Sequence, residues 1–281
     1  QFHQNKTKEL IRKQVELDKS KEHLVVIGSG RLFDFPIEVL DSYKRITLID
    51  ADQSSLDYCK SKLKHFGDTI EFCCLEVTDT LARWNEVLQI ISNNQISFED
   101  FLKAIRINCQ PTIDNVLLDY ATHATSLVSL NIISQIPLAW QRVLERTLIK
   151  KYGERLVYNN QEQWLEVYAD TAKLLLQKHL QDLRLLNAET LCLTYDEYFY
   201  FYSSIFSKSL VAENDLNQSM QIEGLECVSA LVRLEDIIDS YFENYTKEID
   251  EKWVWHILPK TYVLEKQGSF HQVRGVVWIE Q

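Results

Sequence analysis

A strand that ends in a glycine turn, followed by a second strand that ends in an acid, is the feature that most constrains this chain. The segment 23–27 is rich in valine and isoleucine and leads directly into Gly28 and Gly30. The second strand ends on Asp50, which lies 20 residues after Gly30. This order and spacing are typical of a nucleotide-binding β-α-β unit, in which the carboxylate accepts both ribose hydroxyls. Either half alone would suit an ordinary turn or a solvated strand end, whereas together they predict a parallel sheet that binds an adenosine-containing cofactor.

The composition favours a helix-rich α/β domain. The chain has 281 residues, of which 46% are apolar and 25% charged, and these values are ordinary for a globular protein. Only 7 glycines and 4 prolines occur, which argues against a many-turned sandwich or barrel. The formal net charge of −11 is spread along the chain, so we expect no nucleic-acid partner. A small molecule or a protein remains open as the partner.

Membrane and metal sites are not expected. No stretch approaches the ~18 consecutive apolar residues of a membrane span, and the N-terminal segment is polar and lysine-rich, so we expect a soluble cytoplasmic protein. Six cysteines form no CxxC pair and have no histidines at zinc spacing, which predicts buried reduced thiols. They are Cys59, Cys73, Cys74, Cys109, Cys192 and Cys227.

Periodicity predicts an N-terminal helix within residues 1–22 and then one domain over 23–281, with helical insertions near 80–122 and 137–187. We expect strands over 23–27, 46–49, 69–75 and 123–130 and a fifth beginning at 189, with 114–119 as a rival for the fourth. We expect helices over 5–20, 81–91, 98–107, 137–151 and 161–186, with a short one near Pro36. Residues 152–160 read as a mobile connection and 207–222 as a surface excursion. Two strand-like runs, 252–258 and 269–279, predict a C-terminal β-hairpin.

An alternating α/β chain that ends in such a hairpin resembles the Rossmann-like (class I) S-adenosylmethionine-dependent methyltransferases. Gly28-Ser29-Gly30 matches the first part of the family's Gly-x-Gly-x-Gly motif, and Leu32 stands in place of the third glycine. The resemblance implies a doubly wound, mostly parallel sheet that ends in an antiparallel hairpin. It also implies S-adenosylmethionine as the cofactor and methyl transfer as the reaction.

The resemblance also implies positions for the cofactor. The glycine turn would line its methionine and ribose portion. Asp50 would hold the ribose hydroxyls, and the end of the third strand would lie against the adenine. Glu76 is the acid implied at the adenine, and Asp79 is its rival. Asp34 suits either the methionine amino group or a helix N-cap. The cofactor residues implied are Gly28, Ser29, Gly30, Asp34, Asp50, Ala51, Asp52, Glu76 and Val77.

Residues after the fourth and fifth strands are the candidates for the acceptor site. By the same resemblance, Asn131, Ser134 and Gln135 would face the methyl group, although Asn131 equally suits a helix cap. Tyr195, Asp196, Glu197 and Tyr198 are expected at the end of the fifth strand, on the edge where open α/β sheets bind ligands. The alternative is an aromatic rim that packs against the 161–186 helix.

The sequence suggests a small-molecule acceptor but does not identify a catalytic residue. Asn131 is followed by two isoleucines, so the Asn-Pro-Pro-aromatic motif of nucleic-acid amino methyltransferases is absent. His123, His256 and His271 are possible bases, and each also suits a structural role. Two other functions remain open: an NAD-dependent oxidoreductase, which Asp50 would serve equally well, and a non-catalytic methyltransferase-like scaffold.

Overall fold

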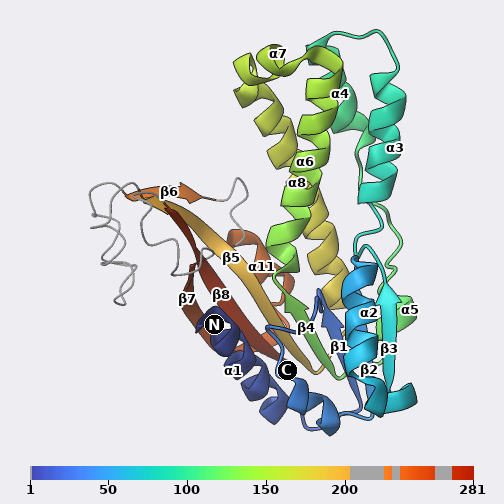
Figure 1. Cartoon of the computed structure of the whole chain (residues 1–281), viewed down its shortest axis with the longest axis vertical. Coiled ribbons are helices and arrows are strands. Elements are labelled where there is room, and N and C mark those ends of the chain that lie inside the picture. The colour runs from blue at the N-terminus through green and yellow to red at the C-terminus, as the bar shows by residue number, and fades with distance from the viewer. Residues whose placement is uncertain (1, 203–224, 230–234, 257–267) are drawn as a thin grey trace.

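The computed structural model of the chain describes residues 2–202, 225–229, 235–256 and 268–281. An eight-stranded sheet forms its centre, with the order β3-β2-β1-β4-β5-β8-β7 and with β6 paired to β5 (Figure 1). Strands β1 to β5 are parallel, and β8 runs antiparallel to both β5 and β7. The strands are β1 (His23–Ile27), β2 (Arg45–Asp50), β3 (Ile70–Cys74), β4 (Ser126–Leu130), β5 (Thr190–Tyr202), β6 (Leu225–Ser229), β7 (Tyr245–His256) and β8 (Gly268–Glu280). The predicted fold class is therefore confirmed.

Helices cover both faces of the sheet. They are α1 (Phe2–Leu17), η1 (Ile37–Ser42), α2 (Gln53–Lys62), η2 (Lys64–Thr69), α3 (Leu81–Ser92), α4 (Phe98–Asn108), α5 (Leu118–Ala121), α6 (Ile132–Tyr152), α7 (Glu154–Asn159), α8 (Gln161–Leu185) and α11 (Glu235–Tyr241). One core joins α3, α4, α6, α8 and α11 to one face, and a second joins α1, η1 and α2 to the other. No described helix is both long and apolar enough to cross a membrane.

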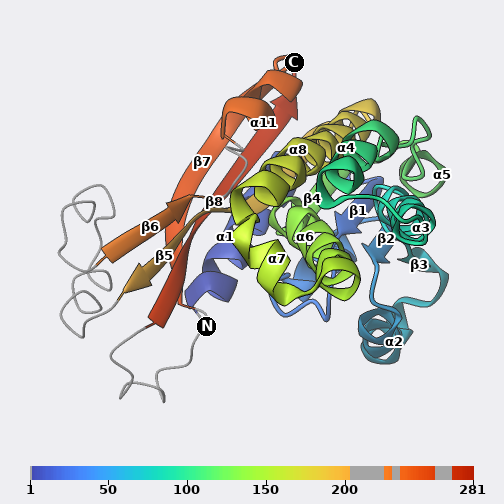
Figure 2. The ribbon, with the colours of Figure 1, turned by 90° about the horizontal axis from the view of Figure 1, so that it is seen from above.

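The helices between β3 and β5 form a bundle that extends beyond the sheet. Figure 1 shows α3, α4, α6, α7 and α8 rising past the ends of the parallel strands. Seen from above, these helices lie side by side, while the long strands β5, β7 and β8 extend away to one side (Figure 2). The bundle therefore stands over the carboxyl edge of the sheet, where parallel α/β sheets bind their ligands.

Helix α1 is tied to the middle of the sheet. Gln14 Nε2 donates to Ser126 Oγ at 2.9 Å and to Leu127 O at 3.0 Å, and Leu10 and Ile11 are fully buried. The helix spans residues 2–17 and not the predicted 5–20, because Asp18 begins the turn into β1 by accepting from the amides of Ser20 and Lys21.

Several predicted boundaries were wrong. Helix α6 begins at Ile132, five residues before Pro137, because a proline in the second turn removes only one backbone hydrogen bond and the first turn buries Ile133 and Ile136. The segment predicted to be a mobile connection forms α7. Strand β7 begins at Tyr245, earlier than predicted, and β6 and α11 were not predicted. The rival strand 114–119 is absent, and 207–222 lies outside the described residues.

The five cysteines with described side chains are free, and four are buried as predicted. Cys74 is exposed, which corrects that part of the prediction, and the side chain of Cys227 is outside the described set. Within the described part of the chain, no group of three or more His, Cys, Asp or Glu residues could hold a metal ion.

Candidate functional site

The glycine turn after β1 is held against the end of β2. The amides of Gly28 and Ser29 both donate to Ile49 O, at 2.9 and 3.2 Å. Gly28 has a φ of +72°, and a Cβ there would lie 2.4 Å from Ile132 Cγ1. Gly30 has a φ of +49°, but a Cβ there would meet nothing within 4 Å. Gly28 thus allows a close approach between β1 and α6, whereas Gly30 borders open space.

The Asp50 carboxylate accepts hydrogen bonds that close this turn, and it can still accept others. Its Oδ2 accepts from Gly30 N at 2.7 Å, and its Oδ1 accepts from Asp52 N at 2.8 Å. A carboxylate offers about four acceptor positions. These two bonds therefore leave about two positions beside the open side of the turn, the number that a ribose diol requires.

Leu32, in place of the third glycine, has a left-handed backbone. Its φ is +58°, in the left-handed region, and its amide donates to Ser29 O at 2.9 Å. The side chain is 4% exposed and packs in the core beside Phe35 and Val39. A left-handed non-glycine residue costs about 1–2 kcal/mol, which this burial offsets. The turn therefore keeps its shape without a third glycine.

Asp34 does not cap a helix. The 3₁₀ element η1 begins at Ile37, its N-cap is Pro36, and that cap has no side-chain hydrogen bond. Asp34 is one-third exposed, and its Oδ2 lies 4.0 Å from His3 Nε2. The N-cap alternative is wrong, and the carboxylate lies beside the first helix of the chain.

Asp52, which the resemblance places along the adenosine, has structural partners. Asp52 caps α2 by accepting from Ser54 N, and the hydroxyls of Ser54 and Ser55 also donate to it, which lowers its pKa. Ala51 beside it is exposed. Both residues still lie at the edge of the site, although the Asp52 carboxylate already accepts hydrogen bonds at the start of α2.

Glu76 is fully engaged within its own loop. Its Oε1 accepts from the amide and hydroxyl of Thr78, and its Oε2 accepts from the amides of Thr80 and Leu81, over 2.7–3.2 Å. These four bonds use the acceptor capacity of the carboxylate. Val77 is buried, while Asp79 is exposed with a φ of +49°. Of the two rival acids, Asp79 is therefore the one with its side chain open to the edge of the sheet.

Asn131 and Ser134 meet the fifth strand. The Asn131 amide donates to Thr194 O at 2.9 Å, and Ser134 Oγ donates to Asn131 O and accepts from Asp196 N, both at 3.1 Å. Asn131 occupies the predicted N-cap position of α6 with a φ of +56°, but its side chain makes no cap hydrogen bond. Gln135 is exposed, unlike these two residues.

Tyr195 belongs to the core. It is fully buried, and its hydroxyl accepts from Arg274 Nη1 at 3.3 Å, while burial raises its pKa above the ordinary value. It shares a hydrophobic core with α8, as the structural alternative expected. Tyr198 is only partly buried and follows an irregularity in the pairing of β5 with β8.

Sequence reasoning named Asp34, Asp196 and His271 as separate candidates but missed that they lie together. They belong to a group that we call the His3–His271 cluster, comprising His3, Asp34, Asp196, Trp255 and His271. Asp196 Oδ2 lies 3.1 Å from His271 Nδ1, whose ring lies edge-on to Trp255 with centroids 5.5 Å apart. Trp255 stacks on His3 at 4.4 Å and 13°. His271 was a candidate base, but no local pattern could reveal its neighbours, which come from α1, the β1 loop, β5 and β7.

The surroundings of His3 favour the neutral form of its ring. Its Nδ1 accepts from Trp253 Nε1 at 2.9 Å, which leaves the proton of the neutral ring on Nε2, toward Asp34. Burial lowers the pKa of His3, while Asp34 and Asp196 oppose that shift. The cluster therefore contains two carboxylates beside a histidine whose environment disfavours a positive charge.

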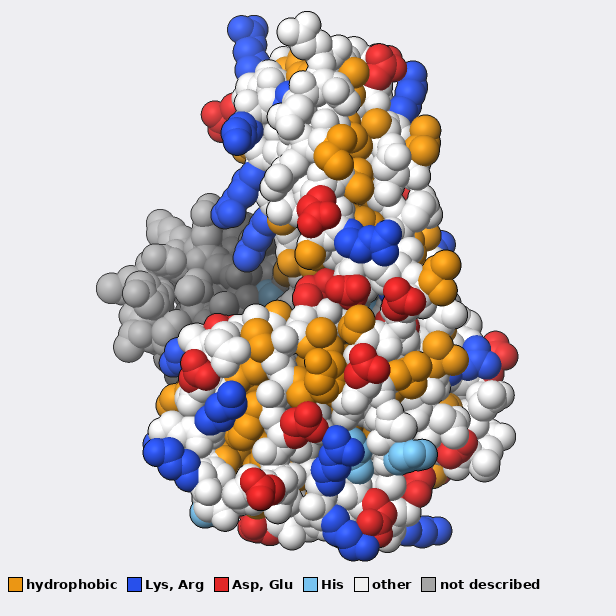
Figure 3. Space-filling model, turned by 90° about the vertical axis from the view of Figure 1, so that its right-hand side faces the viewer, with side chains coloured by type: hydrophobic (Ala, Val, Ile, Leu, Met, Phe, Trp, Pro, Cys, Tyr) orange, Lys and Arg blue, Asp and Glu red, His pale blue; other side chains and the backbone are white. Residues whose placement is uncertain are grey.

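Acidic side chains also surround the sheet edge from the β3 side. Figure 3 shows Asp and Glu side chains in a band across the middle of that face, where the helical bundle meets the sheet. Asp52 and Asp79, both exposed, follow β2 and β3. The electrostatics of this edge favour neutral or cationic ligands.

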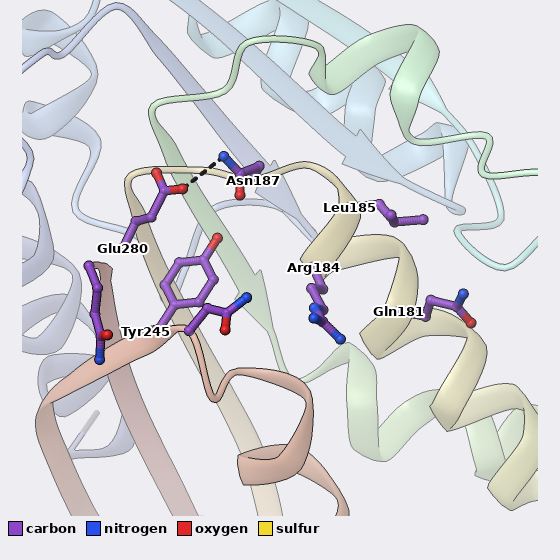
Figure 4. Close-up of a pocket in the computed structure, with 8 residues that line it drawn as sticks. Gln181, Arg184, Leu185, Asn187, Tyr245 and Glu280 are labelled. Atoms are coloured by element: carbon purple, nitrogen blue, oxygen red, sulfur yellow. Dashed lines mark hydrogen bonds between the residues drawn. The ribbon is translucent and has the colours of Figure 1, made fainter.

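A pocket of about 620 Å³ lies elsewhere, at the start of β5 and the end of β8. Figure 4 shows Asn187 bonded to Glu280, with Tyr245 and Arg184 nearby; the bond is 2.9 Å long. The lining residues are Gln181, Arg184, Leu185, Asn187, Asn244, Tyr245, Glu280 and Gln281. Because β5 begins here, this pocket is at the edge of the sheet opposite to the glycine turn and is separate from the candidate site.

No protein-family model matches the sequence, and no curated protein matches it. Similar solved structures include the N-methyltransferase NodS from Bradyrhizobium japonicum, at 7% identity and a TM-score of 0.43 over 99% of this chain and 96% of that one. An S-adenosylmethionine-dependent methyltransferase from Clostridium acetobutylicum has 10% identity and a TM-score of 0.44, over 98% of this chain and 91% of that one. The magnesium protoporphyrin IX methyltransferase ChlM from Synechocystis has 9% identity and a TM-score of 0.42, over 99% of this chain and 83% of that one. Because these scores are below 0.5, the fold assignment rests on the strand order and not on these likenesses.

Proposed function

We propose that this chain is an S-adenosylmethionine-dependent methyltransferase that acts on a small-molecule acceptor. The observation that carries the proposal is the conformation of the backbone beyond the glycine turn. After Gly30 the chain enters turns and a six-residue 3₁₀ element that begins at Ile37, and no α-helix starts at the turn. A cofactor without phosphates suits such a turn better than a dinucleotide does.

The physical reason lies in how a pyrophosphate is bound. Dinucleotide-binding folds place the pyrophosphate at the N-terminus of the helix after the glycine turn, where free amides and the helix dipole stabilise its charge. Their third glycine allows close packing of that helix, but Phe33 occupies the position here. Strand β8 also enters the sheet antiparallel beside β5. These features disfavour NAD, although Asp50 would serve its ribose as well.

The residues present fit the adenosine and methionine parts of S-adenosylmethionine. Asp50 offers the ribose hydroxyls its two remaining acceptor positions beside the open face of Gly30. Within the described residues, Ser29 Oγ is buried and has no hydrogen-bond partner. Donors on the methionine end of the cofactor would satisfy such a group.

The adenine is assigned to the ends of β2 and β3. Ala51 and Asp52 would lie along the adenosine, and Val77 would pack near the base. Asp79 is a better candidate than Glu76 for contact with the adenine amino group, because the Glu76 carboxylate already accepts four hydrogen bonds. This choice revises the cofactor contacts expected from the resemblance.

When bound, the cofactor supplies a methyl group on a positively charged sulfur, ready for transfer to a nucleophile. The residues of this chain bind the adenosine and hold the acceptor in line with that methyl group, which is the main catalytic requirement. The net charge of −11 and the acidic edge of the sheet support a small acceptor and disfavour a nucleic acid.

Calorimetry with S-adenosylhomocysteine and NAD tests the proposal. We expect S-adenosylhomocysteine to bind, and Asp50→Ala to weaken that binding by about 10- to 100-fold, since hydrogen bonds to a charged acceptor contribute about 1.5–3 kcal/mol. Asp68→Ala, which changes an exposed acid in η2, is the matched control. Melting temperatures of both variants verify that they fold.

Each alternative has its own outcome. Binding of NAD alone would refute the methyltransferase proposal and support an NAD-dependent oxidoreductase. Binding of neither compound would support the non-catalytic scaffold. Unchanged affinity in Asp50→Ala would show that the ribose is held by other residues.

A further inference from the structure

Two buried acceptor oxygens, one just after β4 and one within β5, lack a partner among the described residues. They are Asn131 Oδ1 and Asp196 Oδ1, in side chains that belong to residues each 7% exposed. Ser134 joins the two residues, because its hydroxyl bonds to Asn131 O and to Asp196 N. A carboxylate oxygen and an amide oxygen accept hydrogen bonds and cannot donate them, so both would be satisfied by a ligand that carries donors.

The rest of the Asp196 side chain is held in place. Its Oδ2 lies 3.1 Å from His271 Nδ1, and the His271 ring packs edge-on to Trp255. Trp255 in turn stacks on His3 from α1. The His271 ring beside Oδ2 restricts how this carboxylate can turn, and a defined orientation is what ligand recognition requires.

The nearby cations of the described chain are committed to other acids. Lys252 Nζ lies 2.7 Å from Glu197 Oε1, and Arg274 makes two bonds to the Asp250 carboxylate at 2.6 and 2.8 Å. His3, in the same cluster as Asp196, has its pKa lowered by burial. Among the described residues, the one that could balance the negative charge of Asp196 is His271, and only in its protonated form. A positively charged ligand would balance the same charge.

Building on the proposed methyl-transfer function, we propose that Asp196 is the acceptor-binding residue and that the acceptor molecule carries a protonated amine as its recognition group, distinct from the nucleophilic atom that takes the methyl group. The N–H groups of the amine bond to Asp196 Oδ1, and His271 positions the carboxylate through Oδ2. Asn131 Oδ1 supplies a second acceptor at the same edge. A carboxylate-bearing acceptor would be repelled by Asp196 and Asp34, and an alcohol would lack the charge attraction.

The amino group of the cofactor's own methionine is the competing donor. Asp34 is assigned to it, because Asp34 follows the glycine turn by four residues and is partly exposed. The two assignments differ in a measurable way, since a cofactor-binding Asp196 would affect affinity for S-adenosylhomocysteine itself.

The test is calorimetry on the full chain saturated with S-adenosylhomocysteine, with benzylamine, benzyl alcohol and benzoate as probes at pH 7.5. The probes share a ring and differ in the head group. We expect benzylamine to bind at least tenfold more tightly than the other two. Asp196→Asn should weaken benzylamine binding at least tenfold and change the affinity for S-adenosylhomocysteine less than twofold, while Asp68→Asn changes neither.

Variants of His271 separate recognition from folding. His271→Ala should weaken benzylamine binding severalfold because Asp196 loses its orienting partner. His271→Asn, whose amide nitrogen can stand in for Nδ1, should restore most of that binding. A melting temperature for each variant shows whether the fold is retained.

The remaining outcomes overturn the proposal. Absence of benzylamine binding, equal binding in Asp196→Asn, or tighter binding of benzyl alcohol would each refute an amine site at Asp196. A matching loss of S-adenosylhomocysteine affinity in Asp196→Asn would move this residue to the cofactor site. If wild-type protein binds no S-adenosylhomocysteine, the methyltransferase proposal fails, whereas the benzylamine titration without it still tests Asp196.

Discussion

Gly28 and Gly30 have similar backbone conformations but different surroundings. Both have positive φ values, which glycine adopts without the steric cost that a Cβ brings. At Gly28 a Cβ would also overlap Ile132 and would lie 2.8 Å from Leu130 O, so this position joins β1 to β4 and α6. At Gly30 the open side of the turn is the proposed ribose site. One residue is therefore required for packing and the other for ligand access.

Alanine at these two positions should separate stability from binding. We expect Gly28→Ala to lower the free energy of unfolding by about 2–4 kcal/mol, from overlap and left-handed strain together. Gly30→Ala should cost only about 1 kcal/mol but should weaken S-adenosylhomocysteine binding, since its methyl group enters the open space. Urea unfolding and calorimetry measure the two effects, and equal destabilisation by both changes would contradict this account.

Helix α8 combines an apolar stripe with buried polar groups. Lys178 pairs with Asp182 one turn later and donates to Asp114 O at 2.8 Å, which ties the helix to the segment before α5. Burial raises the pKa of Asp182 to about 6 although Lys178 opposes the shift. His179 is fully buried, and neither ring nitrogen has a partner among the described residues. The buried polar side chains of α8 therefore lower the stability of the fold, because they lose contact with water.

His179 should make stability depend on pH. Burial lowers its pKa to about 3 from 6.5, so between these values the unfolded chain binds the extra proton and stability falls as the pH falls. From pH 8 to pH 5 this group should cost ~2 kcal/mol. His179→Leu should remove that loss, as measured by urea unfolding at both pH values.

Asp182 provides an internal contrast to this prediction. Its pKa is raised, so its contribution to stability falls as the pH rises from about 4 to about 6, opposite in sign to that of His179. Asp182 is present in both proteins, so the difference between wild type and His179→Leu isolates the histidine. The same pH slope in both proteins would contradict a buried neutral His179.

At the scale of the whole molecule, the two ends of the chain meet at α1 and β8. Figure 1 shows α1 lying along the long strands of the hairpin, and α1 contacts β5, β7 and β8. A Cβ on Gly275 would lie 2.5 Å from Leu10 Cδ2 and 2.7 Å from the Trp253 ring. The missing side chain at Gly275 therefore lets α1 approach the sheet, and this approach brings His3 to Asp34 and Trp255.

A double-mutant cycle tests this contact. Gly275→Ala should cost about 1–3 kcal/mol through overpacking, and Leu10→Ala about 2–5 kcal/mol through the cavity that it leaves. Together they should cost less than the sum by at least about 0.5 kcal/mol, because the alanine at 275 occupies space that Leu10 has vacated. Urea unfolding gives the energies. Gly275→Ala combined with Leu102→Ala in α4 should be additive, and additivity in the first pair would refute the contact.

Local patterns were sufficient for the parallel half of the fold and for part of the site. Hydrophobic runs predicted β1 to β5, and the glycine turn and Asp50 lie where their spacing placed them, because a β-α-β unit is encoded within about 30 residues. The start of α6 was missed because Pro137 resembles a helix start, whereas packing against the bundle extends the helix to Ile132. Gly153 does end α6, but a new helix, α7, begins directly after it and was also missed.

The sequence by itself determined the class of sheet, its C-terminal hairpin and the pairing of a glycine turn with a strand-end acid. Tertiary structure alone decided which polar groups are engaged and which are left over. Glu76 is used by its own loop, Leu32 takes a left-handed backbone because its side chain is buried, and Asp196 meets His271 across two strands. His3 and Trp253 are 250 residues apart in the chain and yet share a hydrogen bond. Periodicity encodes local conformation and burial, whereas such contacts arise only when the sheet brings distant segments together.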